Sequence, residues 1–330
     1  MKKWDLLSLL IEQAKQNNNK YISGEEISKK YNVTRAAVWK YITELKKLGY
    51  NIESKTNNGY RLITDYDILN EHEISSRLND KNLSFDVIYK KSTDSTNNDA
   101  KKYVGKNNFS VIVAEEQTAG KGRYGRSFHS PNSGGLYFTL KINQNNDDLN
   151  IDSLTFFPLI AATAASLAVS SLYGVELSIK WPNDLLYKTD AGYKKICGIL
   201  TEASIEAESR SVSYVIVGIG LNVNNNISDF PDDIKNIASS LKIISDKTYN
   251  RADILCEIID YFIKLMNIPR EKLLDEYRKK LLTGINISFA QNGRIYKGKA
   301  KDINESGNLI AILENGEETV IQSGEVNFIL

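Results

Sequence analysis

Apolar positions near the N-terminus recur at the spacing of short amphipathic helices. Five leucine and isoleucine residues between Leu6 and Ile11 open the first helix. In the second, Ile27 and Tyr31 are four residues apart and share one face, and Ser23 supplies a hydroxyl that can cap its N-terminus. The two patterns predict a pair of helices that bury their apolar faces in a small domain.

A third helix and a β-hairpin follow at once. Thr34 offers another hydroxyl cap, and the helix is expected to stop at Gly49. Its apolar stripe consists of Val38, Ile42, Leu45 and Leu48. Two short strands, residues 50–54 and 60–63, then flank an Asn-Asn-Gly turn at 57–59. Three helices and a hairpin in this order resemble the winged helix-turn-helix domains of transcription regulators.

From residue 65 to residue 278 the pattern mixes β-branched runs with helical runs and predicts an α+β domain. The expected strands are residues 85–89, 110–114, 135–140, 196–201 and 213–218. Two helices, 154–173 and 252–266, are expected to pack on them. The first is nearly long and apolar enough to span a membrane, but Pro158 and interspersed serine and threonine residues favour a buried helix of a soluble domain.

The last segment alternates short strands with turns such as Ser306-Gly307 and Asn315-Gly316, which is the pattern of a small all-β barrel. The predicted fold class is therefore a multidomain α+β protein. Its expected domains are a winged helix-turn-helix domain at 1–64, a mixed α/β domain at 65–278 and a β-barrel at 279–330.

Charge is distributed unevenly along the chain. The net charge is +1, yet the first 65 residues carry 12 Lys+Arg against 7 Asp+Glu. Positive potential that attracts phosphate backbones is thus concentrated in the predicted winged domain, which favours double-stranded DNA as a partner. The expected DNA contacts are Ser23, Thr34, Arg35, Trp39, Lys40, Lys55 and Arg61. A protein-interaction module with a solvated basic face stays open as an alternative.

Cysteine usage gives the expected compartment. Only Cys197 and Cys256 occur, and neither belongs to a Cys-x-x-Cys motif or to a cysteine and histidine cluster. A structural zinc site is therefore not indicated, and a reducing cytoplasm is the expected location.

Glycines alternate with cations between Gln117 and Arg126, and we call residues 117–126 the cationic loop. Glycines allow such a loop to close over a ligand, while Lys121, Arg123 and Arg126 supply positive charge for a polyphosphate. The loop lacks the Gly-Lys-Ser/Thr ending of a Walker A motif, and no helical pattern follows it, as a dinucleotide fingerprint requires. Alone, it is equally consistent with a basic surface loop or a nucleic-acid contact.

Four further segments accompany the cationic loop in a fixed order. They are Asp-Ser-Thr-Asn at 94–97, Lys-Trp-Pro-Asn-Asp at 180–184, Lys-Ile-Cys-Gly-Ile-Leu at 195–200 and Gly-Ile-Gly-Leu-Asn-Val-Asn at 218–224. The ordered set resembles the biotin protein ligase family. Together with the winged helix-turn-helix domain, it resembles the bacterial members that also repress biotin genes. The resemblance covers nearly the whole chain and implies a ligase domain of the biotin/lipoate ligase type and a C-terminal SH3-like barrel.

The resemblance implies a two-step reaction with ATP and biotin as substrates, usually with Mg²⁺. Biotin carboxylate attacks the α-phosphorus of ATP to give biotinyl-5′-AMP, and a lysine of a biotin carboxyl carrier protein then accepts the biotinyl group. Two anions meet in the first step, so fixed cations must offset their repulsion.

The resemblance also assigns roles to residues. Those matching catalytic positions are Lys195, Arg123 and Asp184. Those matching biotin-binding positions are Ser95, Thr96, Asn97, Gln117, Gly120, Lys121, Gly122, Arg123, Lys195, Gly198, Gly218 and Gly220. Those matching nucleotide-binding positions are Arg123, Arg126, Phe128, Lys195 and Asn222. Helix capping is the alternative for Ser95 and Thr96, and a structural Asn-Asp turn, metal binding or orientation of the incoming lysine are all open for Asp184.

Two residues depart from the family pattern. Lys121 stands where the loop commonly has an arginine, so the charge is kept but a bidentate contact is lost. Phe128 stands where a tryptophan commonly covers the adenine. Both departures affect expected affinities and leave the expected reaction unchanged.

The resemblance further implies a homodimer when the adenylate is bound, which binds operator DNA. Two rival functions remain at this point. A lipoate ligase shares the activation chemistry but typically lacks the winged helix and this cationic loop. A ligand-sensing DNA regulator that has lost catalysis would keep both binding functions without transferring biotin.

Overall fold

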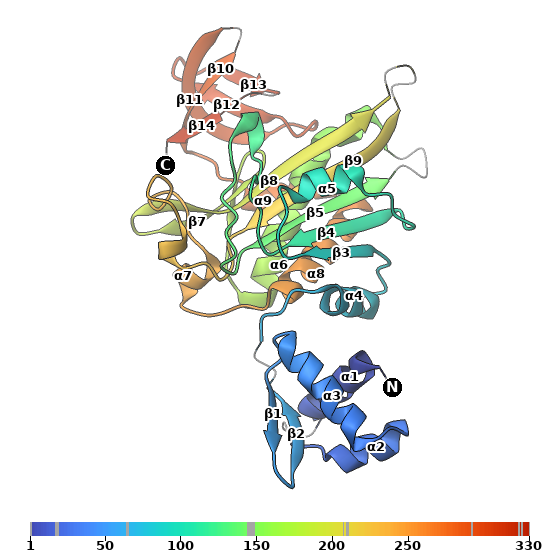
Figure 1. Ribbon diagram of the computed structural model, residues 1–330. Helices are drawn as coiled ribbons and strands as arrows, with labels where there is room; N and C mark the ends of the chain where they lie inside the picture. The colour runs from blue at the N-terminus through green and yellow to red at the C-terminus, as the bar shows by residue number, and fades with distance from the viewer. Residues whose placement is uncertain are drawn as a thin grey trace. The chain divides into compact units, whose positions relative to one another are not determined.

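The computed structural model describes residues 2–16, 20–63, 66–143, 149–206, 208, 211–291, 293–322, 324 and 326–329. The chain divides into two compact units, Met1–Glu73 and Ile74–Leu330 (Figure 1). The helix α4 (Glu71–Asp80) contains the point of division. The expected boundary between residues 64 and 65 lies outside the described residues, and the three domain ranges stay predictions.

The first unit has the predicted three helices and hairpin. They are α1 (Lys3–Gln16), α2 (Gly24–Tyr31), α3 (Arg35–Lys47), β1 (Ile52–Lys55) and β2 (Gly59–Leu62). Ser23 and Thr34 cap α2 and α3 as expected, because their hydroxyls accept hydrogen bonds from the backbone N–H groups of Glu26 and Ala37. The predicted helix-turn-helix architecture is confirmed.

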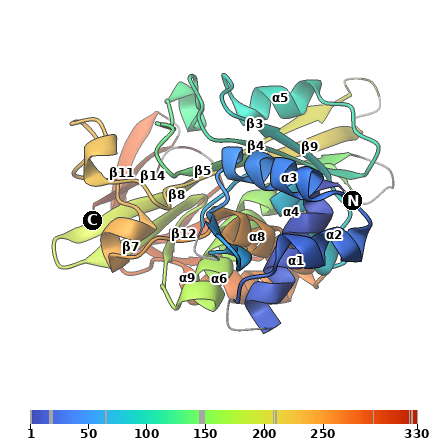
Figure 2. The ribbon, with the colours of Figure 1, turned by 60° about the horizontal axis from the view of Figure 1, so that its bottom comes forward.

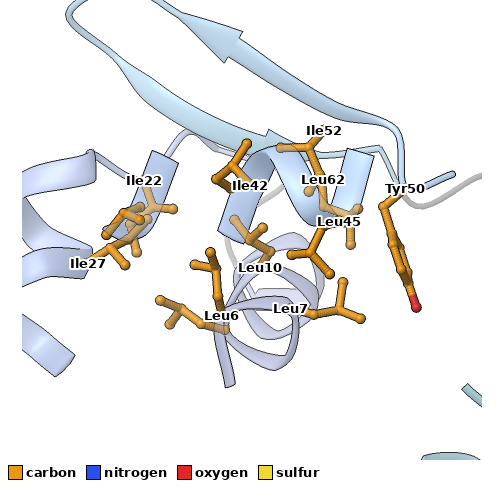
Figure 3. Close-up of a cluster of buried hydrophobic side chains, with 12 residues drawn as sticks. Leu6, Leu7, Leu10, Ile22, Ile27, Ile42, Leu45, Tyr50, Ile52 and Leu62 are labelled. Carbon is orange, nitrogen blue, oxygen red and sulfur yellow. The ribbon is translucent and has the colours of Figure 1, made fainter. Parts of the chain in front are cut away.

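Apolar side chains from all five of these elements and their connections meet in one core (Figure 3). The labelled members are Leu6, Leu7, Leu10, Ile22, Ile27, Ile42, Leu45, Tyr50, Ile52 and Leu62. At the edge of this core the buried Tyr50 hydroxyl donates to Glu73 Oε1 at 2.6 Å, and burial raises the pKa of Tyr50 well above its usual value. The phenol therefore stays neutral and remains a donor.

The second unit contains a seven-stranded mixed sheet with the order β3-β4-β5-β9-β8-β7-β6. Its strands are β3 (Asp86–Lys90), β4 (Phe109–Ala114), β5 (Leu136–Asn143), β6 (Ser178–Lys180), β7 (Asp184–Thr189), β8 (Gly192–Ile205) and β9 (Val212–Leu221). Among the described strands of this sheet, β3 and β4 pair in parallel and the other neighbours pair antiparallel. Strands β8 and β9 are longer than predicted, so the run Gly218-Ile219-Gly220 lies inside a strand and not in a turn.

Helices cover both faces of the sheet (Figures 1 and 2). The short α5 (Thr96–Lys102) lies on one face over β4, β5 and β9, while α6 (Phe157–Tyr173) lies on the other and packs against α8 (Arg251–Met266). Smaller helical elements are η1 (Arg123–Gly125), η2 (Ile151–Phe156), η3 (Ile227–Asp229), α7 (Leu241–Ser245) and α9 (Arg270–Lys280).

The predicted helix 154–173 begins later than expected. Residues Ile151–Phe156 form a 3₁₀ turn capped by Asn150, and the α-helix starts at Phe157 with Pro158 in its first turn. Within the described residues, the stretch Ile151–Tyr173 has the length and composition of a membrane span, but 67% of its most apolar window is buried in the structure. A core helix passes the same test, so this stretch is weak evidence for a membrane.

The C-terminal segment forms a second, five-stranded antiparallel sheet with the order β13-β12-β11-β10-β14. Its strands are β10 (Asn286–Gln291), β11 (Arg294–Ile303), β12 (Leu309–Leu313), β13 (Glu318–Ile321) and β14 (Val326–Ile329). The predicted β-rich C-terminal region is confirmed. The indole N–H of Trp181, which follows β6, donates to the carbonyl of Gly307 in this region at 2.9 Å.

A buried ion pair joins the start of α8 to the end of β4. Arg251 Nη1 donates to Glu115 Oε2 at 2.5 Å and to the carbonyl of Gly135 at 3.0 Å, and the arginine side chain is only 7% exposed. Glu115 lies two residues before the cationic loop, so this pair anchors the segment that leads into the loop.

We expect Glu115→Ala to destabilise the second unit by about 3–5 kcal/mol, because it leaves the Arg251 charge buried without its counter-ion. Urea unfolding of the full chain, followed by circular dichroism, measures the change. Asp232→Ala is the control, since it breaks the exposed ion pair with Lys235 and should leave the unfolding midpoint unchanged. Equal midpoints for both variants would show that the buried pair contributes little.

Candidate active site

Side chains from α5, the cationic loop and strands β8 and β9 converge on one cavity in the second unit. The residues lining it are Ser95, Thr96, Asn97, Gln117, Lys121, Gly122, Phe128, Asn183, Lys195, Gly198, Ile199, Leu200, Gly218, Ile219 and Gly220. The structure therefore brings together most of the predicted biotin-binding positions. Their roles as ligand contacts stay predictions.

The register of three strands sets the floor of the cavity. Gly220 lies opposite both Tyr137 and Gly198, and Gly218 lies opposite both Thr139 and Leu200. A Cβ atom on Gly220 would lie 2.4 Å from Cε1 of Phe128, and one on Gly218 would lie 2.2 Å from Oδ1 of Asn97. These glycines therefore make room for neighbouring side chains. The space that remains is about 50 Å³.

The first turn of α5 contributes polar groups to the cavity. The backbone N–H and the hydroxyl of Thr96 both approach Gln117 Oε1, at 2.9 and 3.0 Å, and Gln117 Nε2 donates to Ser130 Oγ at 2.9 Å. Ser95 occupies the N-cap position, but its side chain makes no capping hydrogen bond. Helix capping is thus not the role of the Ser95 hydroxyl, although the residue is buried beside the cavity.

The carboxylate of Glu202 lies beside the polar groups of α5. Glu202 accepts hydrogen bonds from Asn97 Nδ2 at 2.9 Å and from Lys101 Nζ at 2.6 Å. Burial acts to raise the pKa of Glu202, but the hydrogen bonds from Lys101 and Asn97 outweigh it and hold the pKa below its usual value. Glu202 is therefore ionised at neutral pH.

The cationic loop folds back as a small hairpin over the cavity. Lys121 and Ser127 form an isolated antiparallel β-bridge, and the Phe128 N–H donates to the carbonyl of Gly120 at 2.9 Å. Lys121 Nζ donates to Asn98 Oδ1 at 2.8 Å, while Arg123 Nη1 donates to Asn183 Oδ1 at 3.0 Å. Two of the three predicted cations thus contact the rim of the cavity through neutral amide groups.

Lys195 and Asp184 form an ion pair of 2.8 Å beside the cavity. Lys195 lies in β8, with 37% of its side chain exposed, and Asp184 begins β7 opposite Gly198. Because Asn183 holds Arg123, all three predicted catalytic residues meet in this corner. The sequence left three roles open for Asp184, and the structure adds a fourth, the ion pair with Lys195.

Three predicted nucleotide contacts, Asn222, Arg126 and Arg123, do not line the cavity. Asn222 is buried, and its Nδ2 donates to the carbonyl of Ser239 at 3.0 Å, so it braces the segment that follows β9. Arg126 is exposed at the far end of the cationic loop. Their predicted contacts with a nucleotide stay predictions.

Sequence reasoning missed several polar residues of this region. Thr139 is fully buried in an apolar strand, and its hydroxyl lies 2.6 Å from Asn97 Oδ1. Asn183 stands inside a recognised motif, but its contact with Arg123 gave no signal in the sequence. Glu202 follows the Lys-Ile-Cys-Gly-Ile-Leu motif by two residues, and strand alternation from Gly198 is the signal that places both on the same face.

The predicted DNA-binding residues all lie in the first unit. Trp39 is 63% exposed on α3, and Lys40 and Lys55 are also exposed. Arg35 pairs with Glu25 at 3.2 Å, whereas Arg61 is held by Glu53 and lies over the ring of Tyr21. A cavity of about 440 Å³ is lined by the wing, residues 54–60, together with Ser23, Gly24 and Arg35.

Three family models match the chain. A helix-turn-helix domain matches residues 7–61, the biotin/lipoate A/B protein ligase family matches 85–222, and the biotin protein ligase C-terminal domain matches 283–328. The chain is thus similar to known families in each of the three predicted regions.

Individual relatives show the same similarity. The chain is 35% identical over 317 residues to the bifunctional ligase/repressor BirA of Bacillus subtilis, covering 93% of this chain and 94% of that protein. It is 28% identical over 221 residues to the biotin–[acetyl-CoA-carboxylase] ligase of Mycobacterium tuberculosis, covering 66% and 77%. Among solved structures, the biotin protein ligase of Aquifex aeolicus in complex with biotin and ATP superposes with a TM-score of 0.60 at 28% identity, covering 74% of this chain and 98% of that one.

Proposed function

The chain belongs to the family of bifunctional biotin ligases and repressors, and on that premise we propose that it is an ATP-dependent biotin protein ligase that also represses transcription. The observation that supports the ligase activity most directly is the meeting of Lys195, Arg123 and the polar first turn of α5 around one cavity. A cavity lined by cations and by amide and hydroxyl groups suits a carboxylic acid with a polar ring.

In the first step, an oxygen of the biotin carboxylate attacks the α-phosphorus of ATP. A bond forms between that oxygen and phosphorus, the bond to the bridging oxygen breaks, and pyrophosphate leaves with its electron pair. Lys195 and Arg123 offset the repulsion between the carboxylate and the phosphate, which is the main electrostatic obstacle to the reaction. The product is biotinyl-5′-AMP, a mixed anhydride.

In the second step, the neutral amine of a carrier-protein lysine attacks the acyl carbon. The bond from that carbon to the phosphate oxygen breaks, AMP leaves with the electron pair, and the proton lost by the amine passes to solvent. The anhydride is already activated, so no nucleophilic side chain is required. Cys197 is the nearest thiol to this corner, but it is fully buried, and burial raises its pKa far above neutrality. Asp184 has the charge needed to orient the incoming ammonium group beside Lys195.

In this proposal, Mg²⁺ would accompany the phosphates of ATP. Among the described residues, no group of three or more His, Cys, Asp or Glu side chains could hold a metal ion. Mg²⁺ commonly binds through substrate phosphates with only one or two carboxylates. The donor set near Lys195 offers one such carboxylate, Asp184, so a magnesium ion would be held chiefly by ATP.

Repression requires the winged helix-turn-helix unit to bind double-stranded operator DNA. We propose that the adenylate-bound protein does so as a homodimer in the cytoplasm, and that it transfers biotin to a carboxyl carrier domain when one is available. The exposed basic and aromatic residues on α3 support the DNA contact.

The first experiment incubates the full chain with ATP, magnesium chloride and either biotin or lipoate, and identifies the bound product by mass spectrometry. We expect biotinyl-AMP, and its loss when EDTA is added. Lipoyl-AMP alone would instead establish a lipoate ligase. Addition of a biotin carboxyl carrier domain should then give biotinylated carrier; adenylate without transfer would identify a ligand-sensing regulator.

We expect Lys195→Ala to slow biotinyl-AMP formation by about 100- to 1,000-fold, because it removes a cation that stabilises the transition state. Single-turnover formation of labelled adenylate measures the rate. Lys194→Ala is the matched control, since the neighbouring ammonium bonds to the carbonyl of Asn236 and should leave the rate unchanged. Equal rates in the two variants would remove Lys195 from the mechanism.

We expect Lys40→Ala to weaken binding to mixed-sequence duplex DNA and to reduce the slope of log affinity against log salt concentration by about 0.9, the share of one phosphate contact. Fluorescence anisotropy at several salt concentrations provides the slope. Lys188→Ala, at an exposed site in the second unit, removes the same charge and should leave the slope unchanged. An unaltered slope in Lys40→Ala would argue against a phosphate contact at α3.

A further inference from the structure

Arg123 is held at the edge of the cavity by groups that carry no charge. Its Nη1 donates to Asn183 Oδ1 at 3.0 Å, and its Nη2 donates to the hydroxyl of Tyr124 at 3.2 Å. The guanidinium carbon lies 5.1 Å from the centre of the Tyr124 ring. Within the part of the chain that the structure describes, no carboxylate forms an ion pair with Arg123. The positive charge of Arg123 is therefore positioned but not cancelled.

Strand β8 determines which way the side-chain amide of Asn183 faces. Asn183 Nδ2 donates to the carbonyl of Ile199 at 2.7 Å, and the Ile199 N–H donates to the backbone carbonyl of Asn183 at 3.0 Å. A reversed amide would place Oδ1 against the Ile199 carbonyl and Nδ2 against the guanidinium of Arg123, and neither pair can form a hydrogen bond. The two partners therefore fix Oδ1 as the atom that faces Arg123.

Asn98 holds Lys121 by the same arrangement. Its Nδ2 donates to Asp94 Oδ2 at 2.7 Å, and its Oδ1 accepts from Lys121 Nζ at 2.8 Å. Two cations of the cationic loop are thus held by asparagine oxygens whose amide nitrogens are engaged elsewhere. One asparagine belongs to α5 and the other to the turn before β7, so the arrangement occurs independently in two segments.

We propose that Asn183 is a positioning residue that holds the Arg123 guanidinium ready for the ligand anions and leaves its charge available to them. This inference rests on the proposed ligase function. A carboxylate in place of the amide would also hold the guanidinium, but it would offset the attraction that Arg123 exerts on the biotin carboxylate and the α-phosphate. An apolar side chain would leave the charge and lose the position. The neutral amide meets both requirements.

Asn183 also lines the cavity, so a direct contact with the ligand is the alternative role. The two roles differ in how they depend on Arg123. A residue that acts only through Arg123 has no effect once the arginine side chain is removed. A ligand contact, or support of Ile199 in β8, acts whether or not the arginine is present. A double-mutant cycle separates these cases.

The experiment measures single-turnover formation of biotinyl-AMP by the full chain at saturating biotin and limiting ATP. We expect Asn183→Ala to lower the rate by about 10- to 100-fold, the effect of losing a hydrogen bond to a charged group. In an Arg123→Ala background, the same substitution should change the rate by less than about twofold. Thr189→Ala is the matched control, because it removes a hydrogen bond to the Gly192 carbonyl at the far end of the β7–β8 pair and should leave the rate unchanged.

Asn183→Asp tests the neutrality of the amide with a side chain of the same size. We expect it to be at least as slow as Asn183→Ala, because it adds a carboxylate beside the guanidinium. Circular dichroism first establishes that each variant is folded. Equal losses for Asn183→Ala in the two backgrounds, or a faster rate in Asn183→Asp than in Asn183→Ala, would overturn the positioning role while the ligase function stands. A native chain that forms no biotinyl-AMP would overturn the ligase proposal itself.

Discussion

The pairing register of β5, β9 and β8 is the constraint on which the candidate site depends. It places Gly218 and Gly220 on the face that carries α5, opposite Thr139 and Tyr137. Because side chains alternate along a strand, a slip of one residue would turn Ile219 into the cavity and Gly218 away from it. The Asn97 amide and the Phe128 ring would then have no space against the sheet. One backbone register therefore sets the position of residues from α5 and from the segment after the cationic loop.

Periodicity and capping residues predicted most of the elements, because hydroxyl caps and apolar spacing act locally. Ser23 and Thr34 show this in α2 and α3. The motifs also predicted which segments meet, but not the contacts between them. No signal in the sequence indicated the hydroxyl contact of Thr139 with Asn97 or the hydrogen bond from the Asn222 amide to the carbonyl of Ser239. Such facts depend on strand register and packing between distant segments, which a single sequence does not display.

The C-terminal region contacts the turn between β6 and β7, and this turn carries residues of the candidate site. Trp181 donates to the carbonyl of Gly307, and the next residues of that turn are Asn183, which holds Arg123, and Asp184, which holds Lys195. The backbone of Leu282, after α9, also donates to Ile179 just before the turn. Segments from three regions of the chain therefore fix the corner where the cations meet.

The cations of this corner differ in what holds them, and the difference bears on binding. Lys121 and Arg123 contact the neutral amide oxygens of Asn98 and Asn183, whereas Lys195 contacts the carboxylate of Asp184. Neutral amides position a cation without cancelling its charge, so an arriving phosphate or carboxylate meets the full attraction of the cationic loop. In the proposed reaction, Lys195 would instead exchange the Asp184 carboxylate for the ligand anion, and Asp184 would then be available to the ammonium of an acceptor lysine. On this proposal the same ion pair would serve both steps in turn.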